Sequence, residues 1–205
     1  MTPGDLLILG GGGHAAVVAE SAARAGWRVV GFAAASGGTI GDPDAAGAAG
    51  VESASHAGVA LHAAVGAPEV RARWMTRFGH ARFATIVDPS AVVSPTARLA
   101  AGVFVGAGAV VQSRASLGAG AIVNTRAVVE HDCIVGDFAH LAPAAVLCGS
   151  VEVGRGAQVS AGAVVIPSRR IGAGAMIGAG AVVVRDVEAG VTAVGVPASP
   201  RPPTR

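Results

Sequence analysis

Lysine and tyrosine are both absent from this chain of 205 residues, so all 15 basic residues are arginines. Without lysine the chain can form no lysine Schiff base, and it has no P-loop lysine to hold a nucleotide phosphate. Pyridoxal enzymes and Walker-type ATPases are therefore excluded. Aromatic residues make up only 3% of the chain and the arginines are scattered. The sequence thus lacks the stacking platforms and the basic stripe that favour nucleic-acid binding.

Cysteine is scarce too, with only Cys133 and Cys148, which is too few for a secreted disulfide scaffold. No uninterrupted apolar run reaches the roughly 18 residues of a membrane-spanning helix, and the N-terminus lacks a signal-peptide pattern. We expect a cytoplasmic protein with reduced thiols and no membrane partner. Hydrophobic residues form 52% of the chain, and low charge with apolar composition predicts a folded protein.

From residue 86 onward a six-residue repeat dominates the sequence. Every sixth residue from Val87 to Val183 is aliphatic, seventeen in all, without one insertion. The position four further on is small in sixteen of seventeen hexads, and only Arg169 breaks it. Six is a multiple of the strand period of two and is not a helical period, so each hexad predicts a short strand and a bend. Glycine follows the aliphatic residue in several hexads, where we expect tight corners: Gly106, Gly118, Gly136, Gly154, Gly172 and Gly178. The pattern predicts a parallel β-helix of hexapeptide repeats.

Residues 1–85 have a different pattern, typical of a small Rossmann-like α/β domain. We expect strands at 6–9, 28–32 and 61–65, a helix at 14–24 after a glycine loop, and a second helix from Pro68 through 69–78. The predicted organisation is an N-terminal domain at 1–85, a β-helix at 86–187, and a C-terminal cap and tail at 188–205.

The loop from Gly10 to His14 lies between a predicted strand and a predicted helix, where free amides and the helix dipole favour a phosphate. As a dinucleotide site it is incomplete, because Ala15 replaces the third glycine and Ala34 replaces the acid that would bind a ribose. The loop therefore indicates an anion site, with a simple chain turn as the alternative.

Residues 130–140 are the most polar part of the repeat and hold two histidines and three acids. Polar side chains do not help a β-helix stack, so this stretch indicates a functional site. His131 and His140 are nine residues, or one and a half hexads, apart, so they should lie on different faces. A metal site formed by His131, His140, Asp132 and Cys133 would be hard to close within one chain. The other alternative is that the two histidines are surface residues without a function. Cys133 is better interpreted as a small core residue.

Several short motifs occur in order through both domains: L-G-G-G-G-H at 9–14, A-V-G at 64–66, D-P-S-A-V-V-S-P at 88–95, I-V-N-T at 122–125, V-E-H-D-C at 129–133, H-L at 140–141 and G-V-P-A at 195–198. With these motifs the chain resembles the bacterial sugar-nucleotide acetyltransferases of the PglD and NeuD type, in the hexapeptide-repeat acyltransferase superfamily. The resemblance implies a left-handed β-helix with eighteen residues per coil. It also implies acetyl-CoA as co-substrate, a nucleotide amino sugar as acceptor, and a homotrimer with active sites between subunits.

The same resemblance implies roles for individual residues. His131 would be the general base, Asp132 its supporting acid, and His140 a contact to acetyl-CoA. The nucleotide sugar would bind at Gly12, Gly13, His14 and Gly66, with Asn124 nearby, and CoA would contact the backbone of Ala161 and Ala179. Gly149 follows His131 by eighteen residues, which is one coil of the β-helix that the resemblance implies, and should lie directly above it as an oxyanion donor.

One departure concerns the acceptor. Where the family usually has two acids after the second strand, this chain has Ala34 and Ala35, so the base of the nucleotide is left open. No metal is needed for the expected reaction, because a thiolate leaves readily. We expect N-acetylation of an amino sugar. O-acetylation of a sugar hydroxyl and a non-enzymatic sugar-nucleotide-binding β-helix are the alternatives.

Overall fold

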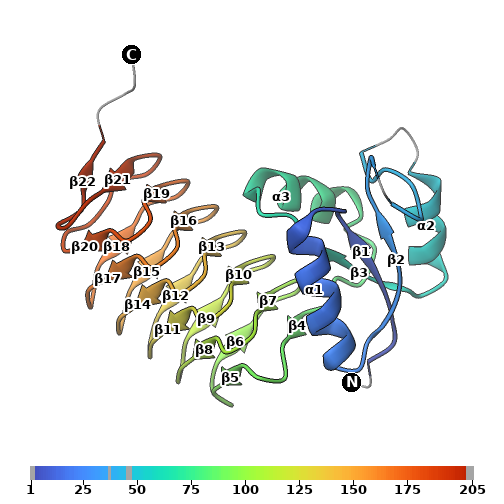
Figure 1. The fold of residues 1–205 in the computed structure, drawn as a ribbon, viewed down its shortest axis with the longest axis horizontal. Coiled ribbons are helices and arrows are strands. Elements are labelled where there is room, and N and C mark those ends of the chain that lie inside the picture. The colour runs from blue at the N-terminus through green and yellow to red at the C-terminus, as the bar shows by residue number, and fades with distance from the viewer. Residues whose placement is uncertain (1–2, 37, 45–47, 202–205) are drawn as a thin grey trace.

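The computed structural model describes residues 3–36, 38–44 and 48–201. These residues form a small α/β domain followed by a long parallel β-helix (Figure 1). Residues 202–205 of the expected C-terminal cap lie outside the described residues. Within the described part, no helix has the length and apolar character needed to cross a membrane.

The N-terminal domain is built on three parallel strands in the order β2-β1-β3. Strand β1 (Asp5–Leu9) is central, and its four apolar residues are fully buried, as the continuous apolar run predicts. Its neighbours are β2 (Arg28–Ala33) and β3 (Ala60–Ala63). Helix α1 (Gly13–Arg24) buries one side, with Ala15, Val18 and Ala22 at helical spacing, and α3 (Pro68–Arg77) begins with the expected proline.

A third helix, α2 (Ala49–His56), is absent from the prediction made on sequence alone. Val51 is its only buried residue, and its side chains make no N-terminal capping bond. An eight-residue helix rich in Ala, Gly and Ser shows no apolar period, so the hydrophobic pattern could not reveal it.

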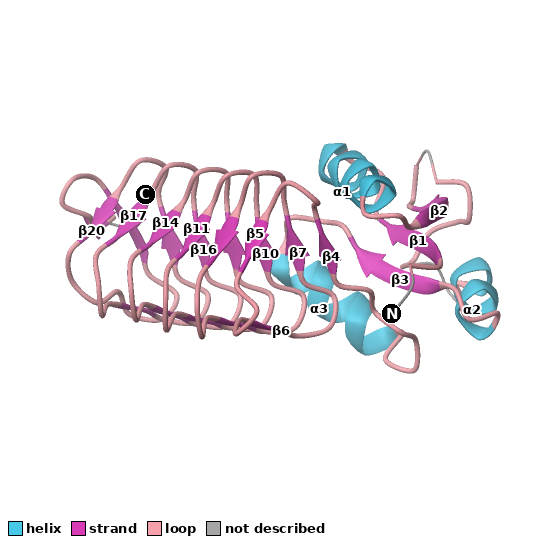
Figure 2. Cartoon of the chain, turned by 90° about the horizontal axis from the view of Figure 1, so that it is seen from below, coloured by secondary structure: helices cyan, strands magenta, loops and turns pink. Residues whose placement is uncertain are grey.

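The β-helix has three faces, each a sheet of very short parallel strands (Figure 2). Paired strands are eighteen residues apart, except at the C-terminal end of one face, where Thr192 pairs with Met176 and the terminal strand is antiparallel. The eight-stranded face contains β4 (Ile86–Val87), β7 (Phe104–Val105), β10 (Ile122–Val123), β13 (His140–Leu141), β16 (Gln158–Val159), β19 (Met176–Ile177), β21 (Thr192–Val194) and β22 (Ser199–Pro200). The six-stranded face contains β5 (Val92–Val93), β8 (Val110–Val111), β11 (Val128–Val129), β14 (Val146–Leu147), β17 (Val164–Val165) and β20 (Val182–Val183). The five-stranded face contains β6 (Arg98–Leu99), β9 (Ser116–Leu117), β12 (Ile134–Val135), β15 (Glu152–Val153) and β18 (Arg170–Ile171).

Both repeat columns point into the β-helix, which confirms the predicted solenoid. The aliphatic column and the small column form one continuous core, with nearly all members buried from Val103 to Val183. Arg169 leaves that core and pairs with Asp186 at 3.8 Å on the surface.

The corner glycines are needed for a different reason from the one expected. Left-handed backbone occurs two positions after the expected corner glycines, in a column that includes Gly108, Gly120 and Gly156 but also Arg114 and Asp132. Glycines such as Gly118 and Gly154 have ordinary φ, but a Cβ there would lie 2.5 Å from a backbone nitrogen of the next coil. Close approach between coils, rather than φ, therefore excludes a side chain at these positions.

The two domains share a buried interface at the first coils. The outward residues Ile86, Phe104 and Ile122 of the eight-stranded face pack into one apolar cluster with residues of β1 and α1. Beside this cluster, the buried Arg71 of α3 donates hydrogen bonds to carbonyl oxygens on both sides of the boundary: Val65 (2.8 Å), Gly66 (2.7 Å), Gly120 (2.9 Å) and Phe138.

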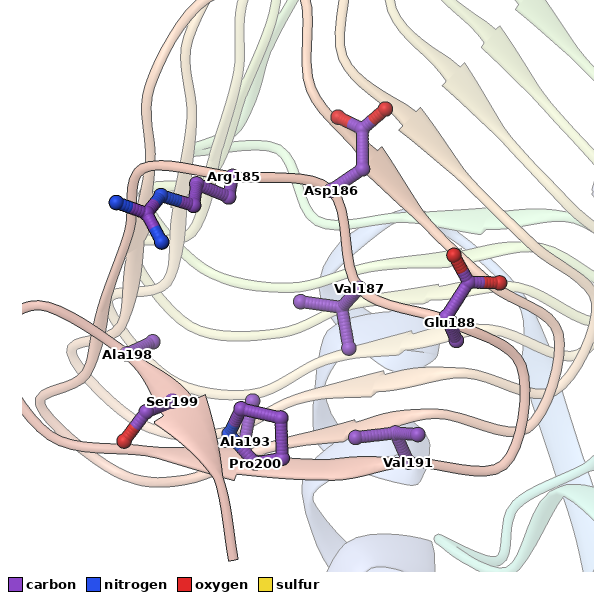
Figure 3. Close-up of a pocket in the computed structure, with 9 residues that line it drawn as sticks. All are labelled: Arg185, Asp186, Val187, Glu188, Val191, Ala193, Ala198, Ser199 and Pro200. Atoms are coloured by element: carbon purple, nitrogen blue, oxygen red, sulfur yellow. The ribbon is translucent and has the colours of Figure 1, made fainter.

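At the other end, β22 pairs antiparallel with β21 and covers part of the last coil. A cavity of about 180 Å³ opens there between residues 185–191 and the terminal strands (Figure 3). None of the residues to which the sequence analysis gave a catalytic or binding role lines this cavity, and those residues lie along the sides of the β-helix.

Candidate active site

The predicted site residues separate into two groups on the surface of one chain. His131, Asp132 and Gly149 lie at the corner between the six-stranded and five-stranded faces. His140 lies on the eight-stranded face, against the N-terminal domain and next to His14, Gly66 and Asn124. The half-coil separation of the two histidines is thus as expected, and one chain does not bring them together.

The first group is centred on a His–Asp pair. Nδ1 of His131 lies 2.8 Å from Oδ2 of Asp132, which holds the imidazole with its proton on Nδ1 and leaves Nε2 as an acceptor. The His131 side chain is 54% exposed, so Nε2 can reach a substrate. Asp132 has left-handed backbone (φ 61°), which turns its carboxylate back toward the neighbouring ring.

Asp132 has a second partner that the sequence analysis missed. Arg114, one coil earlier, donates from Nε to Oδ1 at 2.6 Å and from its terminal nitrogen to Oδ2 at 2.8 Å. The guanidinium, followed by the His131 hydrogen bond, holds the pKa of Asp132 well below its usual range. The carboxylate is therefore ionised and fixed in orientation. The sequence could have indicated this pairing, because Arg114 precedes Asp132 by the eighteen residues of one coil.

Gly149 lies directly over the imidazole, as the eighteen-residue spacing predicts. Its own backbone N–H has no hydrogen-bond partner among the residues that the structure describes, whereas the next N–H, of Ser150, is bound to the His131 carbonyl at 2.9 Å. A free donor is thus available beside the ring.

The second group is half-buried where the two domains meet. Asn124 donates from Nδ2 to Nε2 of His140 at 3.3 Å, and its Oδ1 accepts from the Thr125 amide at 2.8 Å. The rings of His14 and His140 are 6.4 Å apart, and a Cβ on Gly66 would lie 3.9 Å from His140. Three predicted contacts therefore converge on His140, although they come from distant parts of the sequence.

Both histidines of this group are neutral. Burial, and next the charge of Arg71, lowers the pKa of His14 to about 4, and the same causes lower the pKa of His140 to about 4. The Nε2 atom of His14 is buried and has no partner among the described residues. An unsatisfied imidazole nitrogen at this position is available to a ligand.

The glycine loop contains glycines of two kinds. Gly10 has φ 124°, and a Cβ on Gly11 would lie 2.9 Å from Ala34, so the fold itself requires these two. Gly12 and Gly13 have ordinary φ, and a Cβ at either would meet nothing within 4 Å. The amides of Gly12, Gly13 and His14 at the start of α1 have no partner in the described part of the chain. Open space and free donors at a helix N-terminus fit an anion rather than a simple turn.

Ala161 and Ala179 stack on successive coils at the corner between the eight-stranded and six-stranded faces, where the Gly180 amide binds the Ala161 carbonyl at 2.9 Å. Both residues are exposed, and their own amides have no partner among the described residues. They can therefore donate to an extended ligand along the helix axis.

The metal site considered from sequence does not form. His131 and His140 lie on different faces, and Cys133 is fully buried in the core with its thiol directed to the Cys148 carbonyl at 3.1 Å. The interpretation of Cys133 as a core residue is confirmed. Arg71 was missed entirely, because nothing in the pattern of α3 distinguishes a buried arginine from a surface one.

Comparison with known proteins shows which family and fold the chain shares. The model of the PglD N-terminal domain matches residues 5–78. A variant of perosamine N-acetyltransferase from Caulobacter crescentus, in complex with CoA and GDP-perosamine, has 38% sequence identity, covers 97% of each chain and has a TM-score of 0.89. The acetyltransferase domain of PglB from Neisseria gonorrhoeae FA1090, in complex with acetyl coenzyme A, has 34% identity over 96% of this chain and 98% of that one, with a TM-score of 0.88. WeeI from Acinetobacter baumannii AYE shares the fold at 22% identity and a TM-score of 0.83, over 97% of this chain and all of that one. No curated protein matches the sequence.

Proposed function

The chain belongs to the sugar-nucleotide acetyltransferases of the PglD type in the hexapeptide-repeat superfamily, and we propose that His131, Asp132 and Gly149 carry out its catalysis. It transfers the acetyl group of acetyl-CoA to the amino group of a nucleotide-linked amino sugar. The main support for these roles is the imidazole of His131. It is exposed at Nε2, held at Nδ1 by the ionised Asp132, and next to Gly149 of the following coil.

In the proposed reaction, His131 accepts a proton at Nε2 from the acceptor amine as that amine attacks the thioester carbonyl carbon. Asp132 keeps the other ring nitrogen protonated and stabilises the imidazolium that forms. The free amide of Gly149 donates to the oxyanion of the tetrahedral intermediate. When the carbon–sulfur bond breaks, His131 returns its proton to the departing thiolate, so no metal or covalent enzyme intermediate is required.

The six-stranded face supports a trimeric assembly. Its outward column is valine in all six strands, Val92, Val110, Val128, Val146, Val164 and Val182. The five-stranded face instead carries Arg98, Ser116, Glu152 and Arg170 outward, with Ile134 as its one apolar outward residue. The first coils of the eight-stranded face are covered by the N-terminal domain. An apolar face on a triangular prism suits packing around a three-fold axis.

This valine face lies between the two groups of site residues. The His131 corner forms one of its edges, and the corner with Ala161 and Ala179 forms the other. In the proposed homotrimer, His131 of one copy faces the His14, Asn124 and His140 group of the next copy, so that each active site is composite. CoA would then lie along the alanine corner, with His140 at its acetyl end.

The activity is tested by following release of free CoA thiol with a panel of UDP-, GDP- and dTDP-linked amino sugars, with the matching hydroxy sugars as controls. We expect turnover with an amino sugar only. Because Ala34 and Ala35 replace the usual acids, we expect weak discrimination among the bases. Equal turnover of hydroxy sugars would overturn N-acetylation in favour of O-acetylation.

The composite site is tested by complementation between His131→Ala, which should lose the base, and Asn124→Ala, which should bind substrate poorly, with both substrates kept below the wild-type KM. Co-expressed in equal amounts and mixed at random, they should restore about a quarter of the sites, since an intact site needs His131 from one chain and Asn124 from its neighbour. If each active site lay within one chain, mixing would restore none. Light scattering on the wild-type protein should give the trimer mass, and a monomer mass would contradict the assembly.

A further inference from the structure

A cluster of potential metal ligands lies in the N-terminal domain, outside both groups of site residues. Glu52 and His56 are four residues apart on α2 and so share one side of the helix. His80 comes from the turn that follows α3, and its Nε2 lies 3.2 Å from Oε2 of Glu52. The ligand atoms of all three residues lie within 4.8 Å of one another, and no other described group of histidine, cysteine and acidic side chains meets that criterion.

The arrangement of the two rings also fits a shared ion. Their centroids are 5.3 Å apart and their planes are inclined by 24°. A zinc ion held at about 2.1 Å by one nitrogen of each ring, at a tetrahedral angle, would separate the centroids by about 5 Å. The Glu52–His80 distance of 3.2 Å likewise approaches the roughly 3.4 Å between two ligands of such an ion. The rings are stacked in the structure, so both imidazoles would rotate about their side-chain bonds to bring one nitrogen each onto a shared ion.

We propose that Glu52, His56 and His80 bind a divalent transition metal of the zinc class. Two imidazoles and one carboxylate are a donor set that zinc prefers, and water would complete the tetrahedron because the side chains are partly exposed. The site is separate from the acetyl transfer and needs no part of the proposed reaction.

The structure also indicates what such an ion would do. Helix α2 is short, buries only Val51 and has no side-chain cap at its N-terminus, where Ala48 has left-handed backbone (φ 30°). Few contacts therefore fix α2 to the domain. An ion bound by two α2 side chains and by His80 would tie this helix to the end of α3 and stabilise it.

The test is titration of the metal-free full-length protein with Zn²⁺ by calorimetry near neutral pH. We expect one ion per chain. Loss of a ligand by His56→Ala, His80→Ala or Glu52→Gln should weaken binding by about 100-fold or more, since even residues that merely support a ligand cost 10- to 100-fold. His131→Ala is the matched control, because it removes an exposed histidine that also lies beside a carboxylate but has no third ligand. Its affinity for Zn²⁺ should equal that of the wild type.

Hydrogen exchange gives a second, independent measurement. Zn²⁺ should slow exchange of the α2 amides in the wild type and leave the same amides unchanged in His80→Ala. Absence of stoichiometric Zn²⁺ binding would overturn the proposal, leaving Glu52, His56 and His80 as a hydrogen-bonded ring stack only. Binding that survives all three ligand variants would overturn it equally.

Discussion

Gly149 leaves the space that the imidazole of His131 fills: a Cβ on Gly149 would lie 2.6 Å from Cε1 and 2.7 Å from Nε2 of the ring. Its φ is not left-handed, so backbone conformation does not require glycine there. The contact alone excludes a side chain, which ties the identity of residue 149 to the position of the His131 ring one coil below.

Gly149→Ala should therefore displace the imidazole without straining the backbone. We expect kcat to fall by about 10²-fold, the effect of misplacing a catalytic group by an ångström, with little change in either KM. Steady-state kinetics measures this, and Gly4→Ala, at a glycine with ordinary φ and no close neighbour, is the control. Wild-type kcat in Gly149→Ala would show that the ring position is not critical.

The role of Arg114 can be separated from that of Asp132 by the pH profile. Arg114→Gln removes a positive charge from Asp132, so the carboxylate acts more strongly on His131 and the rising limb of kcat/KM should move to higher pH. Asp132→Asn leaves the arginine without its acid and should move the limb to lower pH. Arg155→Gln is the matched control, because Arg155 pairs with Asp137 across the same eighteen-residue step, at 3.1 Å, away from His131. Limbs that move in the same direction in both variants would contradict this account.

Buried neutral histidines should make the fold sensitive to acid. Burial lowers the pKa of His62 from 6.5 to about 4, as for His14 and His140. A group whose pKa is lowered by folding stabilises the protein fully above pH 6.5, and that contribution is lost as the pH falls toward 4. For each such histidine, the free energy of unfolding should fall by about 2 kcal/mol when the pH is lowered from about 7 to about 5.

Urea unfolding at the two pH values measures this loss, and His62→Gln tests its source. Glutamine cannot titrate but can still donate to the Ala84 carbonyl, which lies 2.9 Å from Nδ1 of His62. The variant should lose less stability than the wild type over the same pH range. An equal loss in both would place the acid sensitivity elsewhere.

The sequence predicts the β-helix in detail because its repeat is local: each hexad fixes one strand, and residues eighteen apart must stack. The same arithmetic placed Gly149 over His131 and could have identified Arg114. Contacts between domains have no such period. Tertiary packing, which no local pattern records, determines three other features. These are the convergence of His14, Gly66 and Asn124 on His140, the burial of Arg71, and the position of helix α2 with its single buried valine.

The two kinds of glycine in the first loop lead to a prediction about the acceptor. Gly13→Val meets no atom of the fold within 4 Å of its Cβ, so it should fold normally and obstruct only a ligand on the free amides of α1. We expect a higher KM for the nucleotide sugar and an almost unchanged KM for acetyl-CoA. Equal damage to both substrates would indicate that the loop is merely structural.

His131→Ala tests the general base itself. Loss of a positioned base typically costs about 10² to 10⁴ in rate, so kcat should fall strongly with modest changes in KM. The kcat of Asp132→Asn should lie between that of His131→Ala and that of the wild type, because the imidazole can still accept a proton. His140→Ala should instead mainly weaken the binding of acetyl-CoA, because His140 is expected to contact this substrate and lies beside Asn124, on another face of the chain from His131.

The pH dependence distinguishes the enzyme's base from the substrate's amine. For the wild type, kcat/KM should rise with pH as the base loses its proton, although deprotonation of the acceptor amine could produce a similar limb. In His131→Ala only the limb that belongs to the enzyme disappears, so comparison of the two profiles assigns it. If His131→Ala kept more than about a third of wild-type kcat, far from the 10²-fold loss expected for a base, His131 would not be the catalytic residue. The paired geometry with Asp132 would then serve binding alone.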